Sequence, residues 1–170
     1  MAERGKPVDT VRIKTVAGKV IKQVHRGDEI IRRLNKYAHS VDELDCDVDA
    51  NDILALVSGL SERIALMRGI SLEPDQMPNP VIINTNPFLL ETLVWLFLDF
   101  AMDAAGEKKT VCITSEKTPE KVVVRFSKLQ GLAGMQPGIF PGDSEKSLLA
   151  ALNATAAIDA AAEEIVISFG

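Results

Sequence analysis

The stretch "LLETLVWLFLDFAMDAAG", from Leu89 to Gly106, is apolar on nearly all sides of the helix that its spacing predicts. Asn86 precedes it as a candidate cap, and Pro87 occupies the first helical position, where proline is favoured. A helix without a polar face has to be covered on every side. We therefore expect residues 87–105 to form the buried centre of a domain.

Short strands are predicted on both sides of this helix. The runs "ISLEP" and "PVIINT" precede it around the turn "PDQMPNP", and "KTVCITSEK" and "KVVVRFSKL" follow it as an antiparallel hairpin. A Gly/Pro-rich loop from Gln130 to Gly142, an alanine-rich helix from about Ser144 and the strand "EEIVISFG" complete the chain. This order predicts an α+β fold, an α/β sandwich in which one mixed sheet carries helices on a single face.

The first forty residues predict a long amphipathic helix that starts near Pro7 and Asp9. Apolar residues recur in steps of three, four and seven along one stripe: Ile13, Val16, Val20, Val24, Ile31, Leu34, Ala38 and Val41. At about 1.5 Å per residue the helix would extend some 45–50 Å, longer than a domain of this size can cover. We expect a helix of a partner chain to bury part of the stripe.

A second helix is predicted after the acidic segment "DELDCDVDAND", which reads as a linker. Asp49 or Asn51 is its candidate cap, and Gly69 marks its end. Seven apolar residues lie between these signals: Ile53, Leu54, Leu56, Val57, Leu60, Ile64 and Leu66.

Size and composition describe a soluble globular chain of one domain with an appendage. It has 170 residues, of which 46% are hydrophobic, and a formal net charge of −5. No apolar run approaches the roughly 20 residues that cross a bilayer, and the N-terminus lacks the apolar core of a secretion signal, so we expect a cytoplasmic location. Cys46 and Cys112 have no metal-binding spacing and are expected to be small buried residues.

Charge is distributed unevenly along the chain. Residues 1–40 contain ten Lys/Arg against four Asp/Glu, whereas the remainder contains nine against twenty. Five basic residues of the long helix form a candidate docking surface for an acidic partner: Lys19, Lys22, Arg26, Arg32 and Arg33. The alternative is an ordinary solvated helix face. No aromatic residue lies between these charges and no DNA-binding motif is present, so nucleic acid is not an expected partner.

The order and wording of these elements resemble those of two-component sensor histidine kinases. "RGDEIIRRLNKYAHSVDE" looks like the second helix of the family's dimerisation hairpin, and "VDANDILALVSGLSERIALMRGISLEP" looks like the start of its ATPase domain. "NPFLLETLVWLFLDFAMDAA" resembles the helix that carries the N box. The resemblance implies a dimerisation-type helix and linker over residues 1–44 and a degenerate ATPase domain of the GHKL type over residues 45–170.

The ATP-site residues of that family are missing from the matching positions. The two N-box asparagines, whose oxygens hold the nucleotide's Mg²⁺, fall on Leu96 and Phe100. Asp99 and Asp103 lie nearby, but a residue one position away points about 100° around the helix axis. Asp99 is therefore not expected to replace Phe100.

Two further motifs depart from the family pattern. Where the family has an Asp-x-Gly-x-Gly turn that contacts adenine, this chain has "FSKLQGLAG", with Ser127 or Lys128 near the aspartate position and Gly131 aligned with a glycine. The family's last Gly-x-Gly run is replaced by "PGDSEKSLLAALN", in which Asp143 and Glu145 put negative charge where a phosphate would sit. No cofactor is expected, and ATP with Mg²⁺ would enter only if the chain were an active kinase.

Two histidines are candidate phosphoacceptors. His25 has Glu29 one turn on, and His39 has Glu43 one turn on. Fourteen residues separate them, which returns them to within about 40° of the same helix face. The family's phosphoacceptor, however, lies on the first hairpin helix, so both histidines are expected to be solvent-facing polar residues.

Four interpretations follow. The first is a non-catalytic signalling module, in effect a pseudokinase, which forms a homodimer through its N-terminal helix and docks a response regulator or a sensor kinase. The alternative is a histidine phosphotransferase that passes phosphate in a phosphorelay between a histidine and a response-regulator aspartate. A further alternative is an ATP-binding histidine kinase fragment, and the last is a structural spacer. We expect either a piece of a longer sensor protein or a stand-alone remnant.

Overall fold

The computed structural model describes residues 10–75, 79–136 and 138–170. The predicted start signals Pro7 and Asp9, and part of the turn "PDQMPNP", lie outside these ranges.

The predicted central helix is confirmed as α3, Pro87–Asp103. The side-chain oxygen of Asn86 accepts a hydrogen bond from the Leu89 N–H at 3.0 Å, and Pro87 begins the helix. α3 contacts three other helices and a strand, which explains why apolar residues surround it. Leu93 and Phe97 at its middle are fully buried.

Five strands form a mixed sheet in the order β2-β4-β5-β7-β6. They are β2 (Ser71–Asp75), β4 (Thr110–Lys117), β5 (Val122–Ser127), β6 (Ala154–Asp159) and β7 (Glu164–Phe169). β2 runs parallel to β4, and the other neighbours are antiparallel. The predicted mixed sheet and its β4–β5 hairpin are confirmed.

The acidic segment before α2 is not only a linker. Cys46–Asp49 forms β1, which pairs antiparallel with β3 (Ile82–Thr85) in a separate two-stranded sheet. The prediction of a plain linker is wrong here, and β2 and β3 belong to different sheets. The Asp47 carboxylate accepts a hydrogen bond from the Asn84 side chain at 2.8 Å. Such contacts between distant segments outweigh local composition.

The alanine-rich segment is helical only in its first part. α4 spans Asp143–Ala151, and the alanines that follow form β6. Asn153 has a φ of 50°, in the left-handed region, and it separates the two elements. The helix preference of alanine is at most about 0.7 kcal/mol per residue over ordinary residues. Pairing along the whole of β6 with β7 outweighs it.

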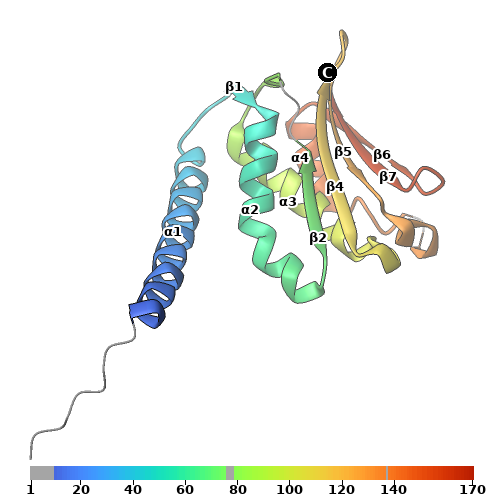
Figure 1. The fold of residues 1–170 in the computed structure, drawn as a ribbon. Coiled ribbons are helices and arrows are strands. Elements are labelled where there is room, and N and C mark those ends of the chain that lie inside the picture. Colours follow the sequence, from blue (N-terminus) through green and yellow to red (C-terminus); the bar gives the residue numbers. More distant parts are fainter. Residues whose placement is uncertain (1–9, 76–78, 137) are drawn as a thin grey trace, which may run out of the picture.

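Helices α2 (Ala50–Arg68), α3 and α4 lie on one face of the five-stranded sheet, as Figure 1 shows. The caps of α2 agree with the sequence. The Asp49 carboxylate accepts a hydrogen bond from the Asn51 N–H at 3.0 Å, and Gly69 ends the helix with a φ of 69°. The hydrophobic core lies between this helical layer and the sheet.

The long helix α1 (Thr10–Ser40) lies on the outer side of the helical layer (Figure 1). Six members of its predicted apolar stripe are each between 51% and 64% exposed: Ile13, Val16, Val20, Val24, Ile31 and Leu34. The stripe is therefore left uncovered by the described part of the chain.

Candidate functional site

The surface of α3 is apolar at Leu96 and Phe100, the two positions that the resemblance matches to the N box. Phe140, from the loop before α4, stacks on Phe100 with ring centroids 4.1 Å apart and 7° between the ring planes. The Phe140 ring also meets Phe97 edge-on at 4.7 Å. Leu96, the other of these two positions, is half-buried. Neither Leu96 nor Phe100 carries an atom that can coordinate Mg²⁺.

A groove of about 340 Å³ lies beside this aromatic stack. It is lined by Phe100, Leu132, Ala133, Met135, Gln136, Gly138, Ile139, Phe140, Ile158 and Ala160. Gln136 is the only one of these with a polar side chain. The lining therefore offers apolar surface and none of the charged groups that usually hold phosphates.

Asp99 and Asp103 are both engaged by Arg68 at the end of α2. An Nη atom of Arg68 lies 2.7 Å from the Asp99 carboxylate, and its other Nη lies 3.1 Å from that of Asp103. These carboxylates thus face α2, and the adjoining position, Phe100, faces the loop.

The glycine at position 131 has a packing role. Its N–H donates to the carbonyl of Ala104 at 2.8 Å, and a Cβ at this position would lie 2.9 Å from the same oxygen. Gly131 therefore lets the loop close directly on the end of α3. Lys128, which the resemblance places near the family's aspartate position, pairs with Glu73 of β2, while Ser127 ends β5. The hydrogen bond that Lys128 donates to the Glu73 carboxylate is the largest cause that raises the pKa of Lys128, and burial acts in the opposite direction.

Acidic side chains occupy the N-terminus of α4. The carboxylate of Glu145 accepts a hydrogen bond from the Gly142 N–H at 2.8 Å, and Asp143 begins the helix. The helix therefore supplies its own negative charge at the end where the backbone N–H groups favour anions.

The two candidate phosphoacceptors lie on α1, and both are exposed. Glu29 and Glu43 follow His25 and His39 by one turn, as the sequence predicts. The Glu43 carboxylate also accepts a hydrogen bond from the Cys46 thiol at 3.7 Å.

At 100° per residue, four of the five basic residues of α1 lie within about 60° of one another, and Arg32 lies outside this arc. Arg26 and Arg33 line the hollow between α1 and α2, whereas Arg32 pairs with Asp28 at 2.8 Å. Lys19 and Lys22 are exposed nearer the start of the helix.

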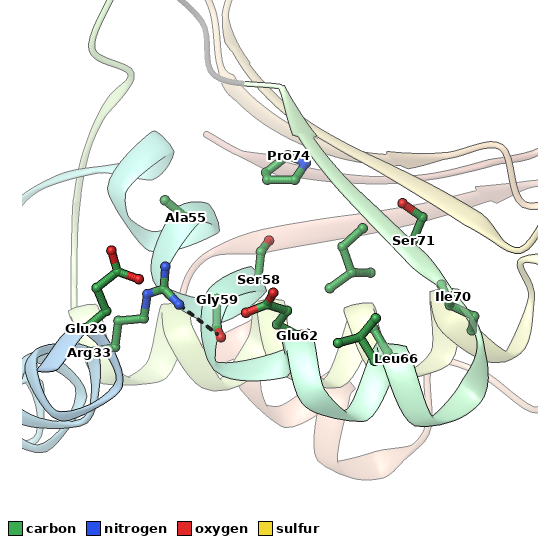
Figure 2. A pocket seen from close by; sticks show the side chains of 12 residues that line it. Glu29, Arg33, Ala55, Ser58, Gly59, Glu62, Leu66, Ile70, Ser71 and Pro74 are labelled. Atoms are coloured by element: carbon green, nitrogen blue, oxygen red, sulfur yellow. Dashed lines mark hydrogen bonds between the residues drawn. The ribbon is translucent and has the colours of Figure 1, made fainter. Parts of the chain in front are cut away.

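Arg33 lines a second, open hollow of about 520 Å³ between α1, α2 and β2 (Figure 2). Its guanidinium donates to the carbonyl of Gly59 at 3.4 Å. Glu29 and Glu62 flank it, and Ser58 lies one residue before the contact. The Ser58 side chain is buried, and its hydroxyl finds no hydrogen-bond partner among the described residues.

Sequence reasoning missed the joint between α1 and the α/β domain. At the last turn of α1, the Ser40 hydroxyl lies 2.6 Å from a carboxylate oxygen of Glu91 in α3, which is 1% exposed. Lys36 pairs with Asp52 at 3.1 Å, and the Tyr37 ring lies 5.8 Å from a ring of α3, that of Phe88. A signal was present in the sequence, since Glu91 is the single charged residue in the run "PFLLETLVWLFL".

Among the residues that the structure describes, no His, Cys, Asp or Glu side chains gather in a group of three or more that could hold a metal ion. No helix in the described ranges has the length and apolar character needed to span a membrane.

Solved structures of sensor histidine kinases share this fold. Histidine kinase AdeS of Acinetobacter baumannii is 17% identical over 96% of this chain and 84% of its own, with a TM-score of 0.59. The catalytic domain of histidine kinase ThkA is 13% identical over 75% of this chain and 96% of its own, with a TM-score of 0.57. Mycobacterial sensor histidine kinase MprB is 17% identical over 74% of this chain and 95% of its own, with a TM-score of 0.55.

These likenesses show the class of fold. The α/β domain has the fold of the histidine kinase catalytic domain, and the match to AdeS includes α1 as well, because it covers nearly the whole chain. Neither a protein-family model nor a curated protein matches the sequence.

Proposed function

We propose that this chain is a non-catalytic module of two-component signal transduction in the cytoplasm. It forms a homodimer through α1 and docks a response regulator or a sensor kinase. Its α/β domain retains the shape of a histidine kinase catalytic domain without serving ATP-dependent phosphoryl transfer.

The observation that carries the proposal is the stack of Phe140 on Phe100. By the resemblance, Phe100 stands where a metal-binding asparagine would be, and Phe140 belongs to the loop that would cover a nucleotide. An aromatic pair at this distance contributes about 0.5–1.5 kcal/mol beyond its buried area. A nucleotide would have to separate the two rings and would then meet apolar surface.

The exposed stripe of α1 supports the dimer. From Ile13 to Leu34 the stripe advances 21 residues in six steps through positions 16, 20, 24, 27 and 31, a mean of 3.5 residues per step. That is the period of a left-handed coiled coil. Gly27 takes one of these positions and would allow a second helix to approach closely. Leaving six such side chains more than half exposed would be costly for a monomer.

A response regulator is the partner favoured by the comparison. One of the similar structures is the complex of histidine kinase ThkA with response regulator protein TrrA, 16% identical over 96% of this chain and 52% of its own, with a TM-score of 0.57. In our proposal, exposed Lys19 and Lys22 at the start of α1 attract an acidic receiver domain and raise its rate of encounter.

The test is a calorimetric titration of the purified chain with ATP and Mg²⁺. We expect no binding heat up to millimolar nucleotide, with the fold verified by circular dichroism in the same buffer. Saturable heat at micromolar ATP that depends on Mg²⁺ would refute the proposal and favour the kinase interpretation. A titration with MgCl₂ alone is the control for metal binding without nucleotide.

A histidine phosphotransferase is the second candidate, because His25 and His39 are both exposed on α1 with a glutamate one turn on. It predicts transfer of phosphate to this chain from a phosphorylated receiver domain. Loss of transfer in His25→Ala or His39→Ala would support it, whereas undiminished transfer to the double variant would exclude these two side chains.

A further inference from the structure

The joint between α1 and α3 contains a buried carboxyl group with an unusual hydrogen-bond arrangement. The Ser40 oxygen lies 2.7 Å from the carbonyl oxygen of Tyr37 and 2.6 Å from a carboxylate oxygen of Glu91. Both neighbours of the hydroxyl are acceptors if Glu91 is ionised. A serine hydroxyl has one hydrogen, so it can donate to only one of them.

A protonated Glu91 removes this conflict. The carboxylic acid then donates its own hydrogen to the Ser40 oxygen, and the Ser40 hydroxyl donates to the carbonyl of Tyr37. Each short contact in the chain of three groups then has its own hydrogen. Counting hydrogens therefore assigns the proton to Glu91 at this joint.

The surroundings of Glu91 favour the neutral form. Its side chain is 1% exposed and shares an apolar hollow with Tyr37, Val57, Leu60, Ile64 and Trp95. Burial is the largest influence and raises the pKa of Glu91. A donated hydrogen bond from Ser40 and the charge of Lys36 act in the opposite direction, and the charge of Glu43 adds to the increase.

Charged groups from α1, the turn after it, β1 and α2 line another hollow, of about 200 Å³, that Glu91 also lines. They are Lys36 of α1, Glu43 of the turn after it, Asp47 and Asp49 of β1, and Asp52 of α2. Lys36 is the single cation in this lining, and Asp52 already engages it at 3.1 Å. The balance of charge around Glu91 is therefore negative, which further opposes its ionisation.

We propose that Glu91 is a neutral carboxylic acid whose hydrogen bond with Ser40 holds α1 against the α/β domain, and that ionisation of Glu91 releases α1. The fold would thereby contain a pH-sensitive joint. This inference goes beyond the proposed function and does not depend on it, because it concerns the orientation of α1 alone.

The other polar contacts of α1 with the α/β domain are weak, so they do little to oppose its release. The Lys36–Asp52 pair is exposed, with side chains 52% and 66% accessible, and exposed pairs contribute little to stability. The Arg33–Gly59 hydrogen bond is long, at 3.4 Å. The desolvation free energy of an ionised Glu91 buried between α1 and α3 is larger than the stabilisation from these two contacts. Opening the joint lets water hydrate the carboxylate.

The sign of the pH dependence follows from the raised pKa of Glu91. The closed joint binds a proton more tightly than the open one, so its stability is fully present below the ordinary glutamate pKa. It falls as the pH rises from that value through the raised pKa.

The single tryptophan of the chain, Trp95, reports on this joint without labelling, since it lies one turn after Glu91 and lines the same hollow. We expect the Trp95 emission of the wild-type protein to shift reversibly to longer wavelength as the pH rises, with unchanged far-ultraviolet circular dichroism. Glu91→Gln imitates the protonated acid, because its amide can donate to Ser40, and it should abolish the shift. His39→Gln is the matched control for histidine titration next to the joint and should retain it.

Infrared difference spectroscopy between wild type and Glu91→Gln tests the protonation directly. As the pH rises, we expect the carbonyl-stretch band of one protonated carboxylic acid, present in the wild type only, to persist above the ordinary glutamate pKa of about 4.3. Absence of that band would overturn the proposal. So would a wild-type emission that does not change with pH while the fold is intact, or a shift that persists in Glu91→Gln.

Discussion

The guanidinium of Arg33 in α1 lies directly over Gly59 in the middle of α2. A Cβ at position 59 would be 2.5 Å from Arg33 Cζ, a separation that no real contact allows. Glycine inside a helix costs about 1 kcal/mol relative to alanine. At position 59 the missing side chain leaves room for Arg33, so α1 and α2 can approach closely. We call the space above Gly59 that holds the Arg33 guanidinium the notch. It is part of the contact between α1 and the α/β domain.

Gly59→Ala should have an effect that depends on Arg33. In an Arg33→Ala background, we expect the substitution to raise the free energy of unfolding by about 1 kcal/mol through helix propensity. With Arg33 present the gain should be smaller, because the guanidinium must leave the notch and lose its bond to the Gly59 carbonyl. Urea denaturation of the four proteins measures this coupling. An equal gain in both backgrounds would show that Arg33 does not occupy the notch.

Phe140→Ala should destabilise the domain by about 2 kcal/mol. The complete loss of a buried phenylalanine costs about 3–5 kcal/mol, and Phe140 is only half-buried. Ile139→Ala is the matched control, because this neighbour is 64% exposed and should change stability by less than about 0.5 kcal/mol. Thermal or urea unfolding measures the loss of stability in each variant. Similar costs for both variants would mean that Phe140 does not stack on Phe100 in solution.

Ile31→Asp should disrupt the α1 dimer, because it places a charge on the coiled-coil stripe. Val11→Asp is the control. Val11 is 74% exposed, and at 100° per residue it lies about 160° around the helix from Ile31, on the side opposite the stripe. Sedimentation equilibrium should give a monomer for Ile31→Asp and a dimer for both wild type and Val11→Asp. Dissociation by both variants, or by neither, would place the interface elsewhere.

Arg68→Ala should cost less than about 1 kcal/mol, because its pairs with Asp99 and Asp103 are partly exposed. The freed carboxylates face α2 and not the loop that holds Phe140, so we expect no gain of Mg²⁺ binding. Chemical denaturation checks the first expectation, and calorimetry with MgCl₂ checks the second. Millimolar or tighter Mg²⁺ binding by the variant would mean that Arg68 masks a metal site.

Local signals in the sequence determined the helices and much of the sheet. Asn86 and Pro87 begin α3, Asp49 and Gly69 bound α2, and the stripe of α1 has a helical period. Each of these caps and periodic patterns depends on residues within one or two helical turns of each other, so it can be recognised from the sequence alone. The exposed stripe on α1 and the apolar character of α3 could be read in the same way.

The tertiary structure alone decided which distant segments meet. Ala154–Asp159 became a strand because β7 pairs with it, although its alanines favour a helix. Phe140 reaches Phe100 across forty residues, and Ser40 meets Glu91 across fifty-one. Glu91 was visible as a lone charge in an apolar run, but the group that satisfies it lies on another helix. Hydrophobic periodicity indicates which face of a segment is buried. The partner of a buried side chain depends instead on long-range contacts that form only when the whole chain folds.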